Sequence, residues 1–211
     1  MNHLRYSGLP FEDQRQAFLD IIWNDPLPRE ALIRARKLGL PDWWVVSGVL
    51  YNSVWNTLTG KPSGHGIKDI DLFYFDAEDL SYDAEDGVIV AGMEVFDDLP
   101  LPVEIRNEAR VHLWYERKFG RTCPPYRDCR HAIDHFASKT HSVGVQLQSD
   151  DTLELYAPYG LDDIFSFRVT PNHALDNRAT HEEKGARAKK NWPEITVLPW
   201  VSEVPTNPGG F

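Results

Sequence analysis

Two aspartates alternate with apolar residues in one short segment of the chain. Asp69 and Asp71 are separated by Ile70 and followed by Leu72. Strand residues two positions apart point to the same face of a sheet, so the two carboxylates should project together while the apolar side chains are buried. Carboxylates held side by side repel each other, and a hard divalent cation is the natural compensation. This spacing predicts a metal site, although an exposed polar strand face would also explain it.

A later segment repeats the alternation and adds a third acid. Glu104 lies between two apolar residues and shares its predicted strand face with Arg106. If the two strands are neighbours, Asp69, Asp71 and Glu104 converge and suit one or two Mg²⁺ or Mn²⁺ ions. Such ions bridge triphosphate oxygens and activate an acceptor hydroxyl, so the trio predicts nucleotidyl transfer from an NTP. Arg106 would hold a phosphate or form a structural salt bridge.

Further candidate side chains stand on other segments. Residues 176–191 are predicted to be helical, and in a helix Lys184, Arg187 and Lys190 lie along one face because they are three positions apart. This stripe would clamp a triphosphate or form a solvated helix face. His112 would be a general base or, more simply, a packing residue.

Two cysteines and two histidines invite comparison with a zinc site. Cys123, Cys129, His131 and His135 are close in the sequence. They lack the short Cys-x₂-Cys knuckle that structural zinc sites use, so free thiols and surface histidines are the better interpretation.

The acidic strands need other elements to hold them in place. Residues 43–46 are an apolar, β-forming run and residues 49–58 have helical periodicity, so Ser47 and Gly48 should form a tight turn between a strand and a helix. Backbone N–H groups at such a helix start can bind phosphate. The other predicted elements are helices over 11–24, 29–37, 109–119 and 127–136, strands over 67–75, 102–108 and 165–169, a hairpin of 143–148 with 152–156, and a partly helical segment over 81–96 in which 88–90 could form a strand.

This order of strand, small-residue turn, helix and acidic strands resembles the signature of the DNA polymerase beta-type nucleotidyltransferase superfamily. In the resemblance, Gly48 corresponds to the turn glycine, Asp69 and Asp71 to the first two metal ligands, and Glu104 to the third. The sequence is similar in more detail to a bacterial nucleotidyltransferase-like family within that superfamily. The stretches that carry this similarity are 48–56, 68–76, 104–115, 156–163 and 171–172.

The resemblance implies a fold and an approximate division of the chain. We expect an α/β (α+β) fold with a mixed β-sheet flanked by helices. Residues 1–42 would form N-terminal helices that pack on a nucleotidyltransferase-like core of residues 43–120. Residues 121–200 would form a C-terminal αβ extension, and 201–211 a mobile tail.

The sequence departs from the superfamily pattern at two positions, which leaves other functions open. The turn usually reads Gly-Ser or Gly-Gly, whereas here Ser47 precedes Gly48. The third acid is Glu104, where aspartate is commoner. The alternatives to an enzyme are therefore a nucleotide-binding or regulatory protein that lacks turnover, and a protein-interaction module of the antitoxin kind.

The composition narrows the location and the partners. The formal net charge of −10 argues against a broad nucleic-acid surface, which leaves a small molecule, a protein hydroxyl or an RNA end as the acceptor. Only two cysteines occur, the first ten residues contain no apolar signal-peptide core, and no apolar run approaches the roughly 20 residues that cross a bilayer. We expect a cytoplasmic protein.

Overall fold

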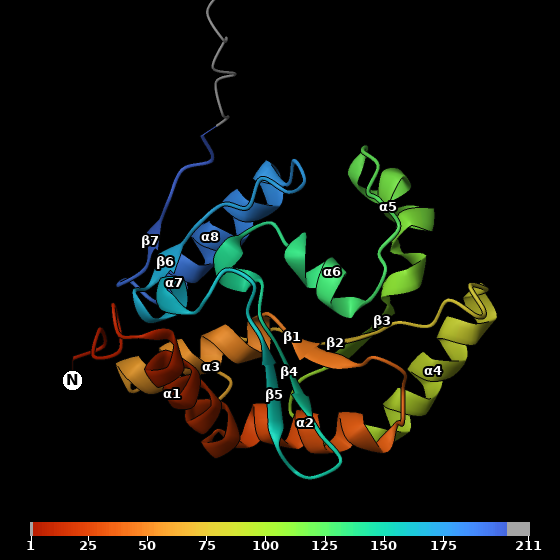
Figure 1. Cartoon of the computed structure of the whole chain (residues 1–211), viewed down its shortest axis with the longest axis horizontal. Coiled ribbons are helices and arrows are strands. Elements are labelled where there is room, and N and C mark those ends of the chain that lie inside the picture. The colour runs from red at the N-terminus through yellow and green to blue at the C-terminus, as the bar shows by residue number, and fades with distance from the viewer. Residues whose placement is uncertain (1, 202–211) are drawn as a thin grey trace, which may run out of the picture.

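A five-stranded mixed sheet lies at the centre of the protein, of which a computed structural model describes residues 2–201 (Figure 1). Its strand order is β3-β2-β1-β4-β5; β2 and β3 run parallel, and the other neighbours are antiparallel. The sheet with helices around it confirms the predicted α/β architecture. Because β4 pairs with β1 and β5 pairs with β4, the sheet continues past the predicted core of residues 43–120. The strands are β1 Trp44–Val46, β2 Ile70–Tyr74, β3 Val103–Asn107, β4 Gly144–Leu147 and β5 Leu153–Tyr156.

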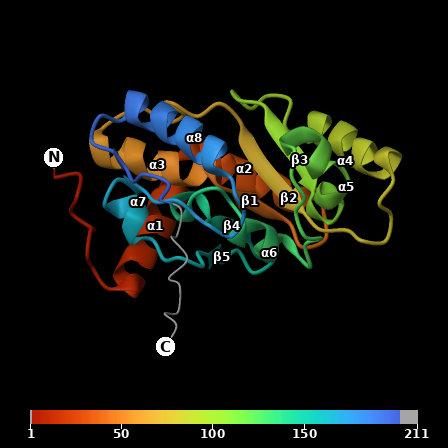
Figure 2. The same cartoon turned by 90° about the horizontal axis from the view of Figure 1, so that it is seen from above.

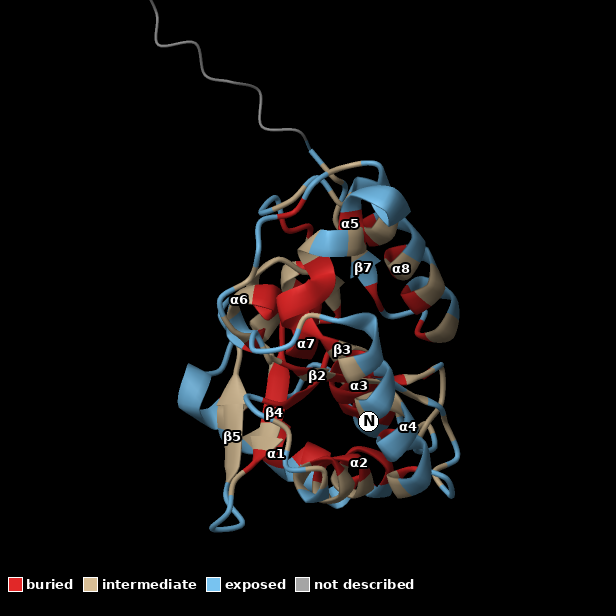
Figure 3. Cartoon of the chain, turned by 90° about the vertical axis from the view of Figure 1, so that its right-hand side faces the viewer, coloured by how far each residue is buried: buried red, intermediate tan, exposed pale blue. Residues whose placement is uncertain are grey.

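Three N-terminal helices cover one face of the sheet. The alternation in β2 turns Ile70 and Leu72 toward them, and both side chains are fully buried. Nearly every residue of the third helix is buried as well, and Figure 3 shows the buried residues gathered on that helix and the central strands. The second helix starts earlier than predicted, because the Asp25 side chain accepts a hydrogen bond from Leu27 N and the prolines fall in the first turn. These helices are α1 Phe11–Asn24, α2 Pro26–Lys37 and α3 Gly48–Thr59.

The opposite face of the sheet is covered by a short helix from the second half of the chain. Helix α6, Cys129–Asp134, packs Ile133 against Trp44 and Val46. Phe73 from β2 contacts Phe136 edge-on, with ring centroids 5.6 Å apart. Two longer helices, α5 Val111–Phe119 and α8 Arg178–Asn191, stand on either side of α6 above this face. Figure 2 shows α8 lying along α3.

Residues 88–90 lie inside a helix in the connection from β2 to β3, so the alternative of a strand there was wrong. Helix α4, Tyr82–Val95, begins where the Ser81 hydroxyl accepts a hydrogen bond from Ala84 N at 3.2 Å. Parallel strands need a crossover, and a helix that packs on the sheet provides it. Gly92 allows this packing, since a Cβ at that position would collide with Ile105. The crossover overrides the β propensity of the valine and isoleucine residues.

Several smaller elements complete the fold, and one differs from its prediction. The strand predicted over 165–169 shortens to two residues because Phe165 ends helix α7 and Phe167 adopts a φ of 52°. The mobile tail predicted over 201–211 lies, apart from Val201, outside the described residues. No helix in residues 2–201 is long and apolar enough to span a bilayer. The smaller elements are α7 Asp162–Phe165, β6 Arg168–Val169, β7 Thr196–Val197 and the 3₁₀ turns Glu108–Arg110 and Lys139–His141.

Candidate active site

The acidic residues meet on two neighbouring strands. Strands β2 and β3 pair in parallel, and their register places Asp71 beside Glu104 and Phe73 beside Arg106. Asp69 lies one residue before β2 and close enough to Asp71 to raise its pKa. The condition that the sequence prediction left open, that the two strands are neighbours, is therefore met in the structure.

Asp71 is the most perturbed of the three acids. Its side chain is partly buried, and this loss of hydration raises its pKa to about 6. The positive charge of Lys184 opposes the shift, whereas the negative charges of Asp69 and Glu104 add to it. The cluster thus carries an electrostatic repulsion that a bound cation would relieve.

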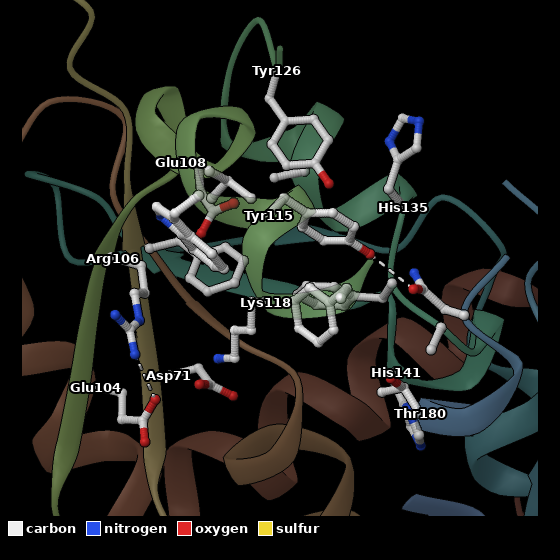
Figure 4. Close-up of a pocket in the computed structure, with 18 of the residues that line it drawn as sticks. Asp71, Glu104, Arg106, Glu108, Tyr115, Lys118, Tyr126, His135, His141 and Thr180 are labelled. Atoms are coloured by element: carbon white, nitrogen blue, oxygen red, sulfur yellow. Dashed lines mark hydrogen bonds and ion pairs between the residues drawn. The ribbon is translucent and has the colours of Figure 1, made fainter. Parts of the chain in front are cut away.

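The acids do not form a closed ligand set by themselves. Throughout residues 2–201, no three side chains of His, Cys, Asp or Glu are placed to hold a metal ion together. Glu104 pairs instead with Arg106, whose Nη2 lies 3.4 Å from its Oε2 (Figure 4). Both side chains are about half exposed, and an exposed pair of this kind contributes little free energy. Hard oxygen donors and mutual repulsion fit a divalent cation.

In the turn before α3, a serine adopts the strained backbone conformation. Ser47 has φ 57° and ψ −116°, a backbone conformation that favours glycine, whereas Gly48 has no positive φ. The turn lies where it was predicted, between β1 and α3, and Ser47 rather than Gly48 adopts the positive φ. The turn is held from both sides, because Ser47 N donates to Val143 O at 2.9 Å and Ser47 O accepts from Leu50 N at 2.9 Å. The start of α3 is thereby fixed beside the acidic strands, since Val46 pairs with Asp71.

Two of the three predicted cations of α8 face the site. Lys184 lines the same cavity as Asp71 and lowers its pKa. Arg187 lines a shallow hollow with Tyr51 of α3, and its charge opposes the increase in the tyrosine pKa that burial causes. Lys190 is exposed. The stripe is thus divided, with two cations directed at the acidic strands and α3 and one in solvent.

A cavity of about 230 Å³ opens beside Asp71, between the sheet and helices α5, α6 and α8. Arg106 and Lys118 line it together with Asp71, Glu104 and Lys184. Six aromatic side chains contribute to the rest of the wall. The rings are those of Phe73, Trp114, Tyr115, Phe119, Tyr126 and Phe136.

The cavity wall includes two buried polar side chains that the sequence analysis missed. Glu108 is 4% exposed, and within residues 2–201 its side chain makes no hydrogen bond or ion pair. Burial, with the nearby charge of Asp71, raises its pKa to about 8, against the opposing charge of Arg106. His141 is 1% exposed and stacks on Tyr51 with ring centroids 4.6 Å apart.

His141 is neutral in this environment. Burial lowers its pKa well below the ordinary value, and the charges of Lys184, His181 and Arg187 lower it further. In the described part of the chain neither ring nitrogen has a hydrogen-bond partner. A signal for Glu108 existed, because it continues the alternation of Glu104 and Arg106, whereas His141 lies in a 3₁₀ turn with no such pattern.

The weaker candidates lie outside this cluster or at its rim. His112, weighed as a base, does not line the cavity, and its Nδ1 is buried without a partner among the described residues. Cys123 and Cys129 are free, buried thiols. His131 and His135 contact each other edge-on at 4.7 Å, and only His135 reaches the cavity wall.

Sequence comparison identifies the family of this chain. A family described as nucleotidyltransferase matches residues 33–197, which cover the turn, all three acids and the α8 cations. The chain belongs to this nucleotidyltransferase family. No protein of curated function matches the sequence.

A solved structure agrees with this family. The fold is similar to an NMR structure described as revealing "a CCA-adding enzyme head domain", at 26% sequence identity and a TM-score of 0.72. The match covers 87% of this chain and 95% of that one. Both the superfamily resemblance and the predicted fold are thus confirmed.

Proposed function

We propose that this nucleotidyltransferase moves a nucleoside monophosphate from an NTP to an acceptor hydroxyl, with a divalent cation, Mg²⁺ or Mn²⁺, held by Asp69, Asp71 and Glu104. The observation that carries the proposal is the register of Asp71 beside Glu104, next to the turn that opens α3. Family membership supports a nucleotide substrate. The repulsion recorded in the pKa of Asp71 supports the cation.

Each group has a separate task in this proposal. A bound divalent cation would neutralise triphosphate oxygens and lower the pKa of the acceptor hydroxyl. Lys184 and Arg187 pair with phosphate oxygens, and the first N–H groups of α3, from Gly48 onward, add hydrogen bonds at the helix N-terminus. Glu104 leaves Arg106, completes the ligand set and helps to take the hydroxyl proton, and Arg106 becomes available to a phosphate.

The transfer itself exchanges one phosphorus–oxygen bond for another. The acceptor oxygen bonds to the α-phosphorus while the bond from that phosphorus to the bridging oxygen breaks. Pyrophosphate leaves with the bonding electron pair, and the acceptor proton passes to a carboxylate. The chain's main contributions are positioning and charge, as this chemistry requires.

A second function, nucleotide binding without turnover, is favoured by one observation. Ser47 holds a conformation that glycine adopts more readily, so its side chain stands at the turn beside α3. A side chain there would alter how closely a triphosphate approaches the backbone. Such a protein would bind Mg²⁺ and NTP as a sensor or regulator and release no pyrophosphate.

The experiment that tests the proposal combines binding with product formation. Mg²⁺-dependent binding of each NTP is measured by calorimetry, and pyrophosphate release is measured with sugars, amino alcohols, RNA 3′ ends and hydroxyl-bearing peptides as acceptors. The variants are Asp71→Asn and, as the matched control, Asp86→Asn, which alters an exposed acid on α4.

We expect binding and release in the wild type and the control, and neither in Asp71→Asn. Binding without release for every acceptor would support the regulatory function instead. No metal-dependent nucleotide binding would contradict both functions and leave a protein-interaction module.

A further inference from the structure

The cavity and the cationic hollow are formed by different elements and adjoin at Lys184. The hollow is formed by α3 and α8, with Tyr51 and Arg187 in its wall. The cavity is formed by β2, β3, α5, α6 and α8, with Glu108 in its wall. Lys184 is the one residue that lines both. If triphosphate binds at α3 and Arg187, the cavity is the space from which an acceptor reaches Asp71.

The interior of the cavity combines aromatic rings with a buried acid. Glu108 is 4% exposed, and no hydrogen bond or ion pair of its side chain occurs in residues 2–201. Figure 4 shows its carboxyl group among the aromatic side chains that line the cavity, which include Tyr115 and Tyr126. A buried carboxylate without a partner is costly, so a protein that keeps one in a cavity wall is suited to a ligand that brings the partner.

We propose that this cavity binds the acceptor, that the acceptor is a hydroxyl-bearing amine, and that its ammonium group pairs with Glu108. Only one part of this proposal rests on the proposed transfer reaction, namely that the amine bound in the cavity is the acceptor. Aromatic faces attract ammonium groups, and a carboxylate adds a charge-assisted hydrogen bond. His141, whose ring nitrogens have no partner in the described chain, is available to the hydroxyl of the same ligand.

Glu108, which keeps its proton in this cavity, favours an amine over a neutral ring such as a nucleobase, because an ammonium group stabilises the ionised carboxylate and a neutral ring does not. Both ligands would contact the aromatic wall, but only the amine neutralises the buried acid. At the rim of the cavity, two of the aromatic rings already contact the ammonium group of a lysine. Lys118 Nζ lies 5.4 Å from the ring centre of Trp114 and 5.3 Å from that of Phe119. An ammonium ligand deeper in the cavity would find the same rings and, in addition, the acid.

The inference is tested by binding alone, without nucleotide. Ligand titrations followed by NMR compare matched pairs in which an amine replaces a hydroxyl: glucosamine with glucose, ethanolamine with ethylene glycol, and serinol with glycerol. The proteins are the wild type, Glu108→Gln, Glu108→Asp and the control Glu116→Gln, which alters an exposed acid on α5.

In the wild type and in Glu116→Gln, we expect at least one amine to bind about tenfold more tightly than its neutral partner, the value of one charge-assisted hydrogen bond. Glu108→Gln should lose that preference, and Glu108→Asp should keep part of it. Equal binding within every pair, or a preference that survives in Glu108→Gln, would overturn the inference. So would tight binding of cytidine or adenosine that depends on Glu108 while no amine is preferred.

This result is separable from the transfer reaction. Calorimetry of Mg²⁺ and ATP with Glu108→Gln should give wild-type affinity, because Glu108 lies on the cavity side. If the wild type does not bind ATP, the proposed reaction is rejected and the amine site is unaffected. Normal ATP binding without amine preference would reject the amine site and leave the reaction standing.

Discussion

Two parts of one cavity treat charge in different ways: the strand edge, which is Asp71, Glu104, Arg106 and Lys184, and the cavity side, which is the aromatic interior around Glu108. On the strand edge, Glu104 is paired with Arg106 and Lys184 stabilises the charge of Asp71, so each acid has a cation from the same chain. On the cavity side, Glu108 is buried among aromatic residues with no cation paired to it in residues 2–201. The edge is thus suited to binding phosphate and a metal ion, because phosphate can replace the acids as partner of Arg106 and Lys184, and a metal ion can replace these cations as partner of the acids. The cavity is suited to a ligand that supplies the missing charge.

Asp71→Asn should have the largest effect, because it disables the strand edge and leaves Glu108 and the aromatic rings of the cavity unchanged. We expect nucleotidyl transfer to fall on the order of 10³-fold, since a ligand to the proposed cation is lost. The fold should persist, because the change removes a repelled, partly buried charge. Pyrophosphate release and thermal unfolding measure the two effects. Near-wild-type transfer by this variant would place the chemistry elsewhere.

Lys184→Ala should have the next largest effect and sharpens the comparison, because this residue lines both the cavity and the cationic hollow. We expect NTP binding to weaken about tenfold through the loss of a charge-assisted phosphate contact. Lys190→Ala removes an exposed lysine from the same helix and should leave affinity unchanged. Calorimetric titration with Mg²⁺ and NTP compares them. Equal losses in the two variants would mean that only the net charge of α8 matters.

Glu108→Gln tests the cavity side through stability rather than activity. The folded protein keeps a proton on Glu108 up to a pKa of about 8, whereas the unfolded chain loses it near 4.5. Wild-type stability from this group therefore falls as the pH rises between these values. The glutamine variant lacks this penalty, so its advantage should be absent at pH 4.5 and reach roughly 2–4 kcal/mol at pH 8.

Denaturant unfolding of Glu108→Gln and of the exposed control Glu116→Gln at both pH values measures this advantage. A constant difference between wild type and Glu108→Gln across the range would mean that Glu108 has an ion partner in solution, which would remove the contrast between the two sides.

Ser47→Gly should have the smallest effect. A serine at φ 57° and ψ −116° is strained, and glycine should stabilise the protein by about 1 kcal/mol. Gly48→Ala is the control, because Gly48 has no positive φ and space for a Cβ, with Asn52 Nδ2 at 3.9 Å. Thermal unfolding measures both variants. Destabilisation by Ser47→Gly would show that the hydroxyl group, rather than the backbone, is what the turn needs.

The edge was predictable from sequence, and the cavity was not. Alternation of acids with apolar residues fixes which strand face Asp71 and Glu104 occupy, because side-chain direction in a strand follows from position alone. The cavity wall comes from β2, β3, α5, α6 and α8, and only tertiary packing brings them together. His141 has no local pattern to mark it. The positive φ of Ser47 was not predictable either, since the identity of a residue does not by itself give its φ.

The most direct test of the edge as a metal-dependent nucleotide site is calorimetric titration of the wild type and Asp71→Asn with α,β-methylene-ATP, which does not release pyrophosphate. Titrations are made with Mg²⁺ and with chelator. Saturable binding should occur in the wild type only with Mg²⁺ and should be lost in Asp71→Asn but kept in Asp86→Asn. Nucleotide binding that is unchanged by chelator and by Asp71→Asn would contradict a metal-dependent site at Asp69, Asp71 and Glu104.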